Sequence, residues 1–510
     1  MGSYLDFKDA SCKDCYKCLR ACPVKAIDVT NHQAKIIDER CILCGTCTIV
    51  CPQNAKIVHS EMDYVKELLK NNTNVVASVA PSCISSFKIS DFSIMKIALG
   101  KLGFSLAEET ALGAQIVVRE YARLMETGQY KNFIVSACPS VCKMIQMYYP
   151  RALKYLAPVD SPMIAHAKLI KSKMPDAKIV FIGPCIAKKR EAAESHLIDG
   201  VLTFEDLNEM FIERGIVLED IHLLDIKDDA KNANLAKAFP ISHGIIQSFE
   251  KLPENYDYMS IDGADRCLNV LENIDSLSNV FIEMNVCQDA CVNGPCSLDK
   301  VGGSIKATSE IRNYVNKEIK RLPIVKKIPE SPVDLSAEYK RLRVSGKIPT
   351  EKEIAEILAK IGKTKPEDEL NCGTCGYSTC REKAWAVYNG YADIEVCLPY
   401  MKQRAESFSY EIIRNSPEGI VVLDFDMNVV EINNKARNLL GIQNEFVKGL
   451  PAVDLFNPSD FVMALEKNQN LEVEKVFIPA SKSYIDLSIN IIKEHRALFG
   501  IMKDVTSEVD

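Results

Sequence analysis

The sequence predicts a multidomain protein that combines α+β and α/β architecture, and three observations support this prediction. The chain has 510 residues, of which 47% are hydrophobic, so it can bury several cores and is too long for one ordinary domain. Most of its 20 cysteines fall into tight groups. Apolar strand-like runs alternate with helical stretches in the middle of the chain, and the C-terminal part has short β-like runs and polar turns. We therefore expect four domains, at residues 1–58, 59–320, 321–402 and 403–510.

The composition limits the partners and the compartment. The formal net charge of −7 comes without a basic block, so neither nucleic acid nor an anionic membrane surface is an expected partner. The first residues lack the basic and apolar regions of a signal peptide, and no apolar run is long enough to span a bilayer. We therefore expect a cytoplasmic protein, in which cysteines stay reduced and serve as metal ligands rather than forming disulfides.

Eight cysteines in the first domain form an internal repeat. The pattern C-x-x-C-x-x-C-x-x-x-C-P occurs twice, at Cys12, Cys15, Cys18 and Cys22 and at Cys41, Cys44, Cys47 and Cys51. It resembles bacterial ferredoxins, in which three closely spaced thiolates hold one 4Fe-4S cluster and the fourth cysteine ligates the other cluster. We therefore assign one cluster to Cys12, Cys15, Cys18 and Cys51, and the second to Cys41, Cys44, Cys47 and Cys22. Two tetrahedral zinc sites are the alternative, because zinc also uses C-x-x-C pairs.

The region that follows Asn74 has the pattern of an α/β domain. Apolar runs such as VVASVAP, NFIVSACP and AKIVFIGPC predict strands, and stretches such as GAQIVVREYARLME predict the helices between them. The stretch RLPIVKKIPESPVDLS, near 321–336, contains prolines and mixed charges and is typical of a linker. A helix around EKEIAEILAKIG and another from about Glu382 are expected after it.

Three separated segments of this domain carry cysteines in a distinctive context: Ser136-Ala137-Cys138-Pro139, Gly183-Pro184-Cys185-Ile186-Ala187-Lys188-Lys189, and Phe281-Ile282-Glu283-Met284-Asn285-Val286-Cys287 followed by Cys291. Singly, each is weak, because a lone cysteine after an apolar strand is more often a small core residue than a ligand. In this order they resemble the three H-cluster motifs of iron-iron (FeFe) hydrogenases, over roughly residues 74–310. The resemblance implies a 4Fe-4S cluster on Cys138, Cys185, Cys287 and Cys291. Cys291 would bridge to a diiron unit with carbonyl, cyanide and azadithiolate ligands, where dihydrogen is split.

Two charged residues match further family positions. By the resemblance, Lys188 donates to a cyanide ligand and Glu191 belongs to the outer proton route. Both stand in the run KKRE, so solvated surface charges are the alternative interpretation.

The departures from the family pattern indicate a sensory-type member. Active members carry a proton-passing cysteine where this chain has Ala137, and the family's relay serine and one relay glutamate fall at Ala157 and Arg123, while Glu120 is the candidate for the other glutamate. Two methionines usual near the diiron unit are replaced, by Gly183 and Asn285. We therefore expect the usual proton relay to be interrupted and turnover to be slow, which a sensor tolerates.

A further compact group is formed by Cys372, Cys375, Cys380 and Cys397. It resembles the additional 4Fe-4S domain of sensory hydrogenases, expected here as a small, mostly helical domain, and a structural zinc site is the alternative. Glycines between its ligands let the backbone approach the metal. The remaining cysteines are expected as buried thiols, with Cys296 the one nearest to expected ligands: Cys83, Cys142, Cys267 and Cys296.

The segment SFSYEIIRNSPEGIVVLDFDMNVVEINNKARNLLGI resembles a PAS domain, an α+β fold with an antiparallel sheet. It predicts an entry helix, a strand pair that turns at Asp424 to Asn428, and a short helix around Asn434 to Leu440. No cysteine follows Cys397, which excludes flavin chemistry through a cysteinyl adduct within this domain. His495 is expected on a terminal strand, as an ordinary polar residue rather than a haem ligand. The expected role is protein contact or homodimerisation.

These features together predict a slow FeFe hydrogenase that senses dihydrogen. Its expected cofactors are three 4Fe-4S clusters and an H-cluster, and its expected partners are dihydrogen, protons, a redox protein, hydrogenase maturation proteins and a signalling chain such as a kinase or phosphatase. Two rivals remain open. One is a hydrogenase-like electron-transfer or cluster-assembly protein without a diiron site, and the other is a competent metabolic hydrogenase.

Overall fold

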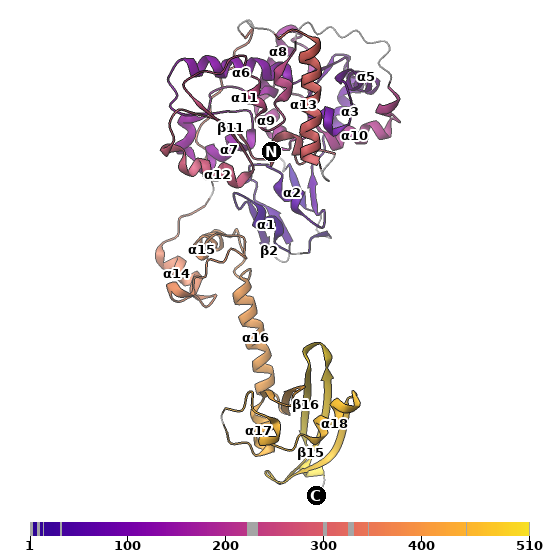
Figure 1. The fold of residues 1–510 in the computed structure, drawn as a ribbon, viewed down its shortest axis with the longest axis vertical. Helices are drawn as coiled ribbons and strands as arrows, with labels where there is room; N and C mark the ends of the chain where they lie inside the picture. The colour runs from indigo at the N-terminus through magenta and orange to yellow at the C-terminus, as the bar shows by residue number, and fades with distance from the viewer. Residues whose placement is uncertain are drawn as a thin grey trace. The chain divides into compact units, whose positions relative to one another are not determined.

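The computed structural model describes residues 4–7, 11–13, 15–30, 33–221, 233–298, 303–324, 331–344, 346–444 and 446–508. The chain divides into two compact units, Met1–Val396 and Cys397–Asp510, which are described separately below (Figure 1). Among the described residues, no helix has the length and apolar character needed to cross a membrane.

The N-terminal part of the first unit is built from two short antiparallel strand pairs and two short helices. The elements are β1 (Leu5–Phe7) paired with β4 (Lys56–Val58), β2 (Ile27–Thr30) paired with β3 (Gln33–Ile36), α1 (Lys17–Ala21) and α2 (Thr46–Val50). Each helix begins after a residue in the left-handed region, Tyr16 with φ 56° and Gly45 with φ 73°. The two halves of the repeat therefore fold alike, as the sequence repeat requires.

The central part holds two parallel sheets. The first has the order β6-β5-β8-β9, from β5 (Val75–Val79), β6 (Leu106–Glu109), β8 (Lys178–Gly183) and β9 (Gly200–Thr203). The second has the order β10-β11-β7, from β7 (Phe133–Ile134), β10 (Asp257–Asp262) and β11 (Val280–Asn285). All residues of β5 and β11 are buried, which explains why these strands have continuous apolar runs rather than alternation.

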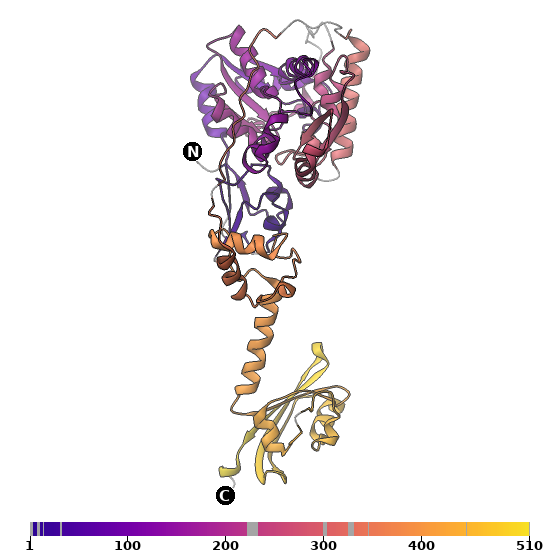
Figure 2. The ribbon, with the colours of Figure 1, turned by 90° about the vertical axis from the view of Figure 1, so that its left-hand side faces the viewer.

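Helices cover both sheets, as Figure 2 shows from the side. They are α3 (Met62–Asn71), α4 (Cys83–Ser86), α5 (Phe92–Leu102), α6 (Ala111–Glu126), α7 (Pro139–Tyr148), α8 (Pro162–Lys173), α9 (Ala187–Ser195), α10 (Phe204–Glu213), α11 (Gly244–Gln247), α12 (Ala264–Asn273) and α13 (Gly303–Arg321). The predicted strands and the predicted helix in GAQIVVREYARLME all occur in these positions.

The stretch expected as a linker at 321–336 lies partly outside the described residues, and its described end is not a free connector. The backbone amide of Asp160 donates to Leu335 O at 2.8 Å, and that of Ala337 donates to Pro158 O at 3.0 Å. Leu335 is buried. This extended segment therefore belongs to the surface of the central domain.

A small helical domain follows, with α14 (Glu351–Ala359) and α15 (Cys380–Tyr388). Arg40 of the N-terminal part joins it, because its guanidinium lies 4.9 Å from the Trp385 ring and 5.1 Å from the Tyr391 ring. The same guanidinium lies 5.9 Å from the ring of Tyr148 in α7. Arg40 is 8% exposed, so it holds three parts of the unit together at a largely dry point.

Replacing Arg40 by alanine should loosen the small helical domain. We expect a loss of about 1–2 kcal/mol of docking free energy, because desolvated cation–π contacts are lost together with the packing of the arginine stem. Hydrogen-exchange mass spectrometry of the full chain should show faster exchange in α14 and α15. The exposed Arg312→Ala on α13 is the control, and equal exchange in both variants would contradict this role for Arg40.

The second unit is an antiparallel sheet of order β13-β12-β16-β15-β14 with helices packed on it. Its elements are α16 (Leu398–Asn415), β12 (Gly419–Asp424), β13 (Val429–Ile432), α17 (Asn434–Leu440), α18 (Ser459–Lys467), β14 (Leu471–Ile478), β15 (Ser483–Ile492) and β16 (Ala497–Asp504). The predicted entry helix, the turn at Asp424 to Asn428 and the short helix all occur. The carboxylate of Asp424 closes the turn by accepting from the amides of Asp426 and Asn428.

Asn433 ties the entry helix to the sheet of the second unit. Its amide nitrogen donates to Ile413 O at 2.9 Å and to Glu418 O at 2.8 Å, and its side-chain oxygen accepts from the amides of Ile420 and Ala436 at 2.8 Å. The side chain is buried and uses its full donor and acceptor capacity in these contacts. A movement of α16 would therefore be transmitted to the start of β12.

The expectation for His495 is wrong in one respect. His495 lies in a short 3-10 turn, Lys493–His495, between β15 and β16, and it is exposed rather than on a strand. The polar run there ends in Arg496, which has φ 49° and reverses the chain.

Candidate functional site

The four cysteines expected as H-cluster ligands lie near the carboxyl ends of parallel strands. Cys138 follows β7 and caps α7, Cys185 follows β8, and Cys287 follows β11. Cys291 stands in a 3-10 turn, Ala290–Asn293, just beyond. The strands come from both sheets, so the site forms where the carboxyl ends of the two sheets converge. This is the usual position for ligand sites in parallel α/β folds.

The four thiols are close enough to influence one another. Burial, reinforced by the neighbouring Cys138, raises the pKa of Cys185 to about 11. Burial also raises the pKa of Cys287 and Cys291 well above the usual value, and the other cysteines of the group add to both shifts. Thiolates in such a place need a neighbouring positive charge to form, which a metal centre supplies.

A cavity of about 90 Å³ adjoins Cys185 and Cys291. Its wall is largely apolar and includes residues of the three motifs as well as the ends of β5 and β6: Ala80, Pro81, Ser82, Thr110, Ala111, Ala114, Ala137, Pro162, Met163, Phe181, Pro184, Lys188, Phe239, Pro240, Ile245 and Asn285. The buried hydroxyl of Ser82 has no hydrogen-bond partner among the described residues. A buried hydroxyl of this kind beside a cavity next to two thiols fits a polar, metal-bound group as its partner.

Lys188 reaches the same cavity from α9. Its ammonium lies 2.6 Å from Glu191 Oε2, 3.0 Å from Ser161 Oγ and 3.5 Å from Ala137 O. Burial alone would lower the pKa of Lys188, but the Glu191 carboxylate and the nearby thiols raise it, so the side chain stays cationic. Lys188 is only 9% exposed, so it is not a solvated surface charge. The structure thus joins Lys188 and Glu191 into one ion pair at the cavity.

The residues predicted to interrupt the proton relay lie in different surroundings, and their effect on a relay stays a prediction. Ala137 lines the cavity and offers no exchangeable side-chain proton, and Ala157 is fully buried. Glu120 forms a bidentate pair with Arg123 on the same helix, at 2.9 and 2.6 Å. Both carboxylate oxygens of Glu120 therefore accept hydrogen bonds from an exposed arginine.

The two replaced methionine positions have local explanations. A side chain at Gly183 would meet the Phe181 ring, because a Cβ there would lie 2.8 Å from it. Asn285 instead donates to the buried carboxylate of Asp262 at 3.1 Å, which also binds the hydroxyl of Ser242. The polar environment of Asn285 was not visible in the sequence, since Asp262 belongs to a different strand.

The eight N-terminal cysteines form two groups. Cys12, Cys15, Cys18 and Cys51 line one small cavity of about 20 Å³. Cys22 lies instead near the second triplet. Burial raises the pKa of Cys47, and its neighbours Cys44, Cys41 and Cys22 raise it further. These neighbours are the same as in the cross-ligation assignment, which itself stays a prediction.

The second of these groups adjoins the four central cysteines. The charge of Cys44 contributes to the raised pKa of Cys287, and Arg190 of α9 donates to Cys41 O at 2.8 Å. Gly45 lies so close to Pro295 that a Cβ on it would come within 2.4 Å of the proline ring. A cluster on Cys22, Cys41, Cys44 and Cys47 would therefore be the neighbour of a cluster in the central domain.

Three cysteines of the third expected group, Cys372, Cys375 and Cys380, lie in the first unit. Cys372 is exposed, and hydrogen bonding from Thr374 lowers its pKa. Cys380 begins α15, and its amide donates to Asn371 Oδ1 at 2.8 Å. Gly373 and Gly376 have φ 70° and 91°, which lets the chain fold tightly between ligand positions. Cys397 is buried at the start of α16 in the second unit.

The four cysteines not expected as ligands are buried: Cys83, Cys142, Cys267 and Cys296. The Cys142 thiol lies 3.5 Å from Ser136 O and the Cys267 thiol 3.3 Å from Asn285 O.

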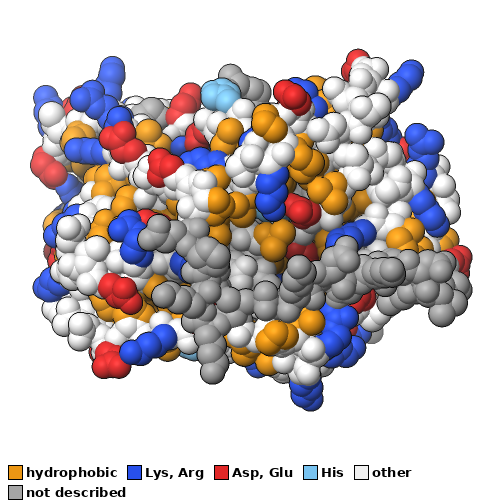
Figure 3. Space-filling model, turned by 90° about the horizontal axis from the view of Figure 1, so that it is seen from above, with side chains coloured by type: hydrophobic (Ala, Val, Ile, Leu, Met, Phe, Trp, Pro, Cys, Tyr) orange, Lys and Arg blue, Asp and Glu red, His pale blue; other side chains and the backbone are white. Residues whose placement is uncertain are grey.

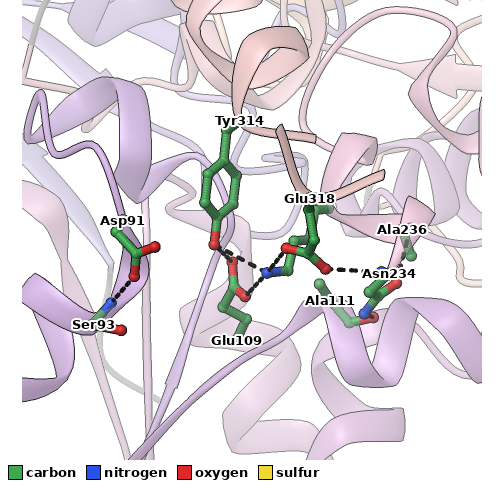
Figure 4. Close-up of polar contacts among 9 residues, drawn as sticks. Asp91, Ser93, Glu109, Ala111, Asn234, Ala236, Tyr314 and Glu318 are labelled. Carbon is green, nitrogen blue, oxygen red and sulfur yellow. Dashed lines mark hydrogen bonds and ion pairs between the residues drawn. The ribbon is translucent and has the colours of Figure 1, made fainter. Parts of the chain in front are cut away.

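A buried ion-pair network includes Glu109, Tyr314 and Glu318 (Figure 4). Lys237, just before the cavity residue Phe239, lies 2.7 Å from Glu109 Oε2 and also pairs with Glu318. Its ammonium lies 3.0 Å from the Tyr314 hydroxyl, which in turn lies 3.2 Å from Glu109 Oε1. The network therefore joins β6 and α13 to the segment that leads to Phe239.

Figure 3 shows one face of the molecule, on which Lys and Arg side chains are interspersed with Asp and Glu side chains. This face offers a mixed surface, unlike the single-sign patch that nucleic-acid binding uses.

Four parts of the chain match family models. Residues 73–295 match the family described as iron only hydrogenase large subunit, C-terminal domain. Residues 11–55 match a 4Fe-4S dicluster domain, 368–399 match an Fe-S cluster family and 417–507 match a PAS domain. The expected fold class is therefore confirmed.

Individual relatives are distant. Iron hydrogenase 1 of Clostridium pasteurianum is 28% identical over 375 residues, which cover 57% of this chain and 65% of that protein. The NADP-reducing hydrogenase subunit HndD of Solidesulfovibrio fructosivorans is 23% identical, with 44% of each chain covered. The cytosolic Fe-S cluster assembly factor NAR1 of Yarrowia lipolytica is 21% identical, with 34% of this chain and 43% of that protein covered. The chain thus spans less than two thirds of the length of these three relatives.

Solved structures of two kinds are similar. A variant of FeFe-hydrogenase HydA1 from Chlamydomonas reinhardtii has 16% identity and a TM-score of 0.44, with 56% of this chain and 99% of that chain covered. The PAS domain of an HTR-like protein from Haloarcula marismortui has 20% identity and a TM-score of 0.17, with 20% and 98% covered. From the domain matches, the chain is a hydrogenase-like iron-sulfur protein with a PAS domain.

Proposed function

We propose that this protein is a slow FeFe hydrogenase that senses dihydrogen and passes its state to a signalling partner. The cavity beside Cys185 and Cys291, with the Lys188 ammonium at its wall, is the observation that carries the proposal. An electron carrier needs only ligands for a cubane, whereas this site adds an apolar space, a buried cation and an unpartnered Ser82 hydroxyl.

In this proposal the residues of the site have separate tasks. Cys138, Cys185, Cys287 and Cys291 would hold the cubane, and Cys291 would also hold the diiron unit. Lys188 and Ser82 hold polar ligands of that unit, and the apolar wall excludes water. When bound, the unit supplies a metal that polarises dihydrogen and an amine that takes up a proton.

The ferredoxin-like clusters connect this site to other proteins. Cys22, Cys41, Cys44 and Cys47 would hold a cluster that exchanges electrons with the central site. Cys12, Cys15, Cys18 and Cys51 would hold one that exchanges electrons with a redox partner. The group Cys372, Cys375, Cys380 and Cys397 holds a further 4Fe-4S cluster. α16 follows Cys397 directly and leads along the chain to the PAS domain, so this helix would carry the signal. The domain then contacts a kinase, a phosphatase or a second copy of the chain.

Slow turnover follows from the replaced relay positions. A single Ala137→Cys substitution should raise hydrogen production by less than ~10-fold. General acid–base catalysis accelerates a reaction by ~10²–10⁴-fold, but here it requires a continuous route for the proton. Ala157 and the Glu120–Arg123 pair still interrupt that route. Steady-state hydrogen production with a chemical reductant measures the effect, and Ala137→Cys/Ala157→Ser/Arg123→Glu is the comparison. A large gain from the single substitution would contradict this account.

Infrared spectroscopy tests the proposed function. The anaerobically purified full chain is exposed to a synthetic diiron precursor, and its spectrum is recorded in the region of metal-bound carbonyl and cyanide. Sharp bands that shift under dihydrogen are expected. If no bands form while a control hydrogenase loads from the same precursor, the diiron site is refuted.

The second candidate is a hydrogenase-like electron-transfer or assembly protein that binds cubanes only. The similarity to NAR1 favours it, because that relative is described as an Fe-S cluster assembly factor. This second candidate predicts iron and sulfide in the amounts needed for the cubanes, and no carbonyl or cyanide bands.

A further inference from the structure

A chain of hydrogen-bonding side chains leads from the diiron cavity toward the surface on the side of β5 and β6. Thr110 lines the cavity together with Cys291 and Ala137. Its hydroxyl lies 2.9 Å from Ser78 Oγ, and Ser78 Oγ lies 2.8 Å from His166 Nδ1. His166 Nε2 lies 3.2 Å from Glu108 Oε2. Each contact is within hydrogen-bond distance, so the chain is continuous.

The burial of these residues changes along the chain. Thr110 and Ser78 are buried, and His166 is fully buried at 0% exposure. The Glu108 side chain is 25% exposed, so it can exchange protons with water. The two ends of the chain therefore lie at the cavity wall and at the solvent.

The fold fixes this arrangement from three separate elements. Ser78 of β5 is paired with Glu108 of β6 in the parallel register, and the amide of Thr110 donates to Val79 O at 2.8 Å. His166 comes from α8, which packs against α6 (Figure 1). Gly113 of α6 permits this contact, because a Cβ there would lie 2.6 Å from the backbone nitrogen of His166.

The chemistry of the four groups suits proton transfer. Hydroxyls both accept and donate, and imidazole takes a proton on one nitrogen and releases one from the other. Hydrogen bonding from His166 lowers the pKa of Glu108, so the outer end is an anion that can receive a proton. A satisfied core histidine needs one partner on each nitrogen and no link to a cavity. Here Ser78, the partner of His166 Nδ1, also forms a hydrogen bond with Thr110, which lines the cavity.

We propose that Thr110, Ser78, His166 and Glu108 conduct protons between the diiron cavity and solvent, in place of the interrupted relay. This inference rests on the proposed function, since it needs a proton source in the cavity. A proton that reaches Thr110 Oγ1 displaces the hydroxyl proton to Ser78, the Ser78 proton moves to His166 Nδ1, and the Nε2 proton moves to Glu108. One proton thus enters and one leaves, without a change in oxidation state, and the reverse sequence delivers protons inward.

The test uses the full chain loaded with the synthetic diiron precursor. A rapid drop in pH is applied, and the rate at which the carbonyl bands shift reports arrival of protons at the site without turnover. His166→Gln keeps hydrogen-bonding capacity but removes the imidazole ring, and Thr110→Val keeps the shape but removes the hydroxyl. Both should slow the band shift at least ~10-fold. Ser248→Ala is the matched control, because it removes a buried hydroxyl that donates only to backbone carbonyls, Leu235 O and Gly244 O.

The outcomes separate the two proposals. Carbonyl and cyanide bands of normal position with slowed shifts in both chain variants, and a normal rate in Ser248→Ala, are expected. Normal bands with an unchanged rate in either chain variant would overturn the proton chain and leave the proposed function intact. If the unmodified protein forms no bands, the proposed function fails and the proton chain fails with it.

Discussion

Cys291→Ala should abolish the carbonyl and cyanide bands of the loaded protein completely. The proposed bridge between the cubane and the diiron unit is the Cys291 thiolate, and alanine offers no donor to replace it. The cavity and Lys188 remain in this variant, but noncovalent contacts alone cannot hold a diiron unit against solvent. The variant should keep the iron and sulfide of the ferredoxin-like clusters, because their ligands belong to the N-terminal domain.

Cys83→Ala is the matched control for this substitution. Cys83 is fully buried near β5 but is not assigned as a ligand, so its loss should cost about 1 kcal/mol of stability and leave the bands unchanged. Infrared spectra and iron content are measured side by side for both variants. Bands of full intensity in Cys291→Ala would show that the diiron unit is attached elsewhere or that another group of the cavity holds it.

The sequence could predict the groups of cysteines better than the surroundings of the cavity beside Cys185 and Cys291. Ligand spacing such as C-x-x-C is a local property, so Cys12, Cys15 and Cys18 are readable from a few residues. The fourth ligand of this set, Cys51, could be assigned only from knowledge of how the repeat folds. Strands such as β5 and β8 were readable because strands buried on both faces keep continuous apolar runs.

The polar surroundings could not be predicted because they join residues distant in sequence. Ser161 comes to Lys188 from the start of α8, and Asp262 comes to Asn285 from the neighbouring strand. His166 meets Ser78 only through the packing of α8. The cysteine motifs include none of the partner residues Ser161, Asp262, Ser78 and His166. A single histidine in a helix gives no signal of its own. The position of a cavity relative to them is a property of the whole domain.

The interrupted relay and the hydrogen-bonded chain through His166 both affect the expected rate of proton transfer at the cavity. Ala137 removes the proton donor nearest to the cavity, whereas Thr110 retains a hydroxyl on another part of its wall. A route through hydroxyls and a single imidazole must reset its hydrogen bonds after each proton. Slow, reversible equilibration with dihydrogen is sufficient for a sensor and insufficient for a metabolic catalyst.

Lys237→Met should destabilise the central domain by about 3–5 kcal/mol. Lys237 is the cation of the buried network that also contains the carboxylates of Glu109 and Glu318. Methionine fills similar space but leaves two carboxylates together without a positive charge. For a domain of this size, the melting temperature should fall by roughly 10 °C.

The stability lost in Lys237→Met should depend on pH in a defined direction. Burial raises the pKa of Glu109, and Lys237 acts against this shift. Without the lysine, the carboxyl pKa in the folded state rises further, so the folded variant retains a proton that the unfolded chain releases. Stability that depends on such a proton is present at low pH and is lost as the pH rises. The difference in melting temperature between variant and parent should therefore grow from about pH 5 to about pH 8.

Two further variants make this prediction specific. Lys251→Met removes the cation of an exposed pair with Glu254, whose side chains are 84% and 83% exposed, and should change stability by less than about 0.5 kcal/mol. Glu109→Gln/Lys237→Met removes one buried charge of each sign and should recover part of the loss. Hydrogen exchange in α13 locates the effect, because Glu318 and Tyr314 belong to that helix. A deficit in Lys237→Met that stays constant with pH would show that lost packing, rather than uncompensated charge, is its cause.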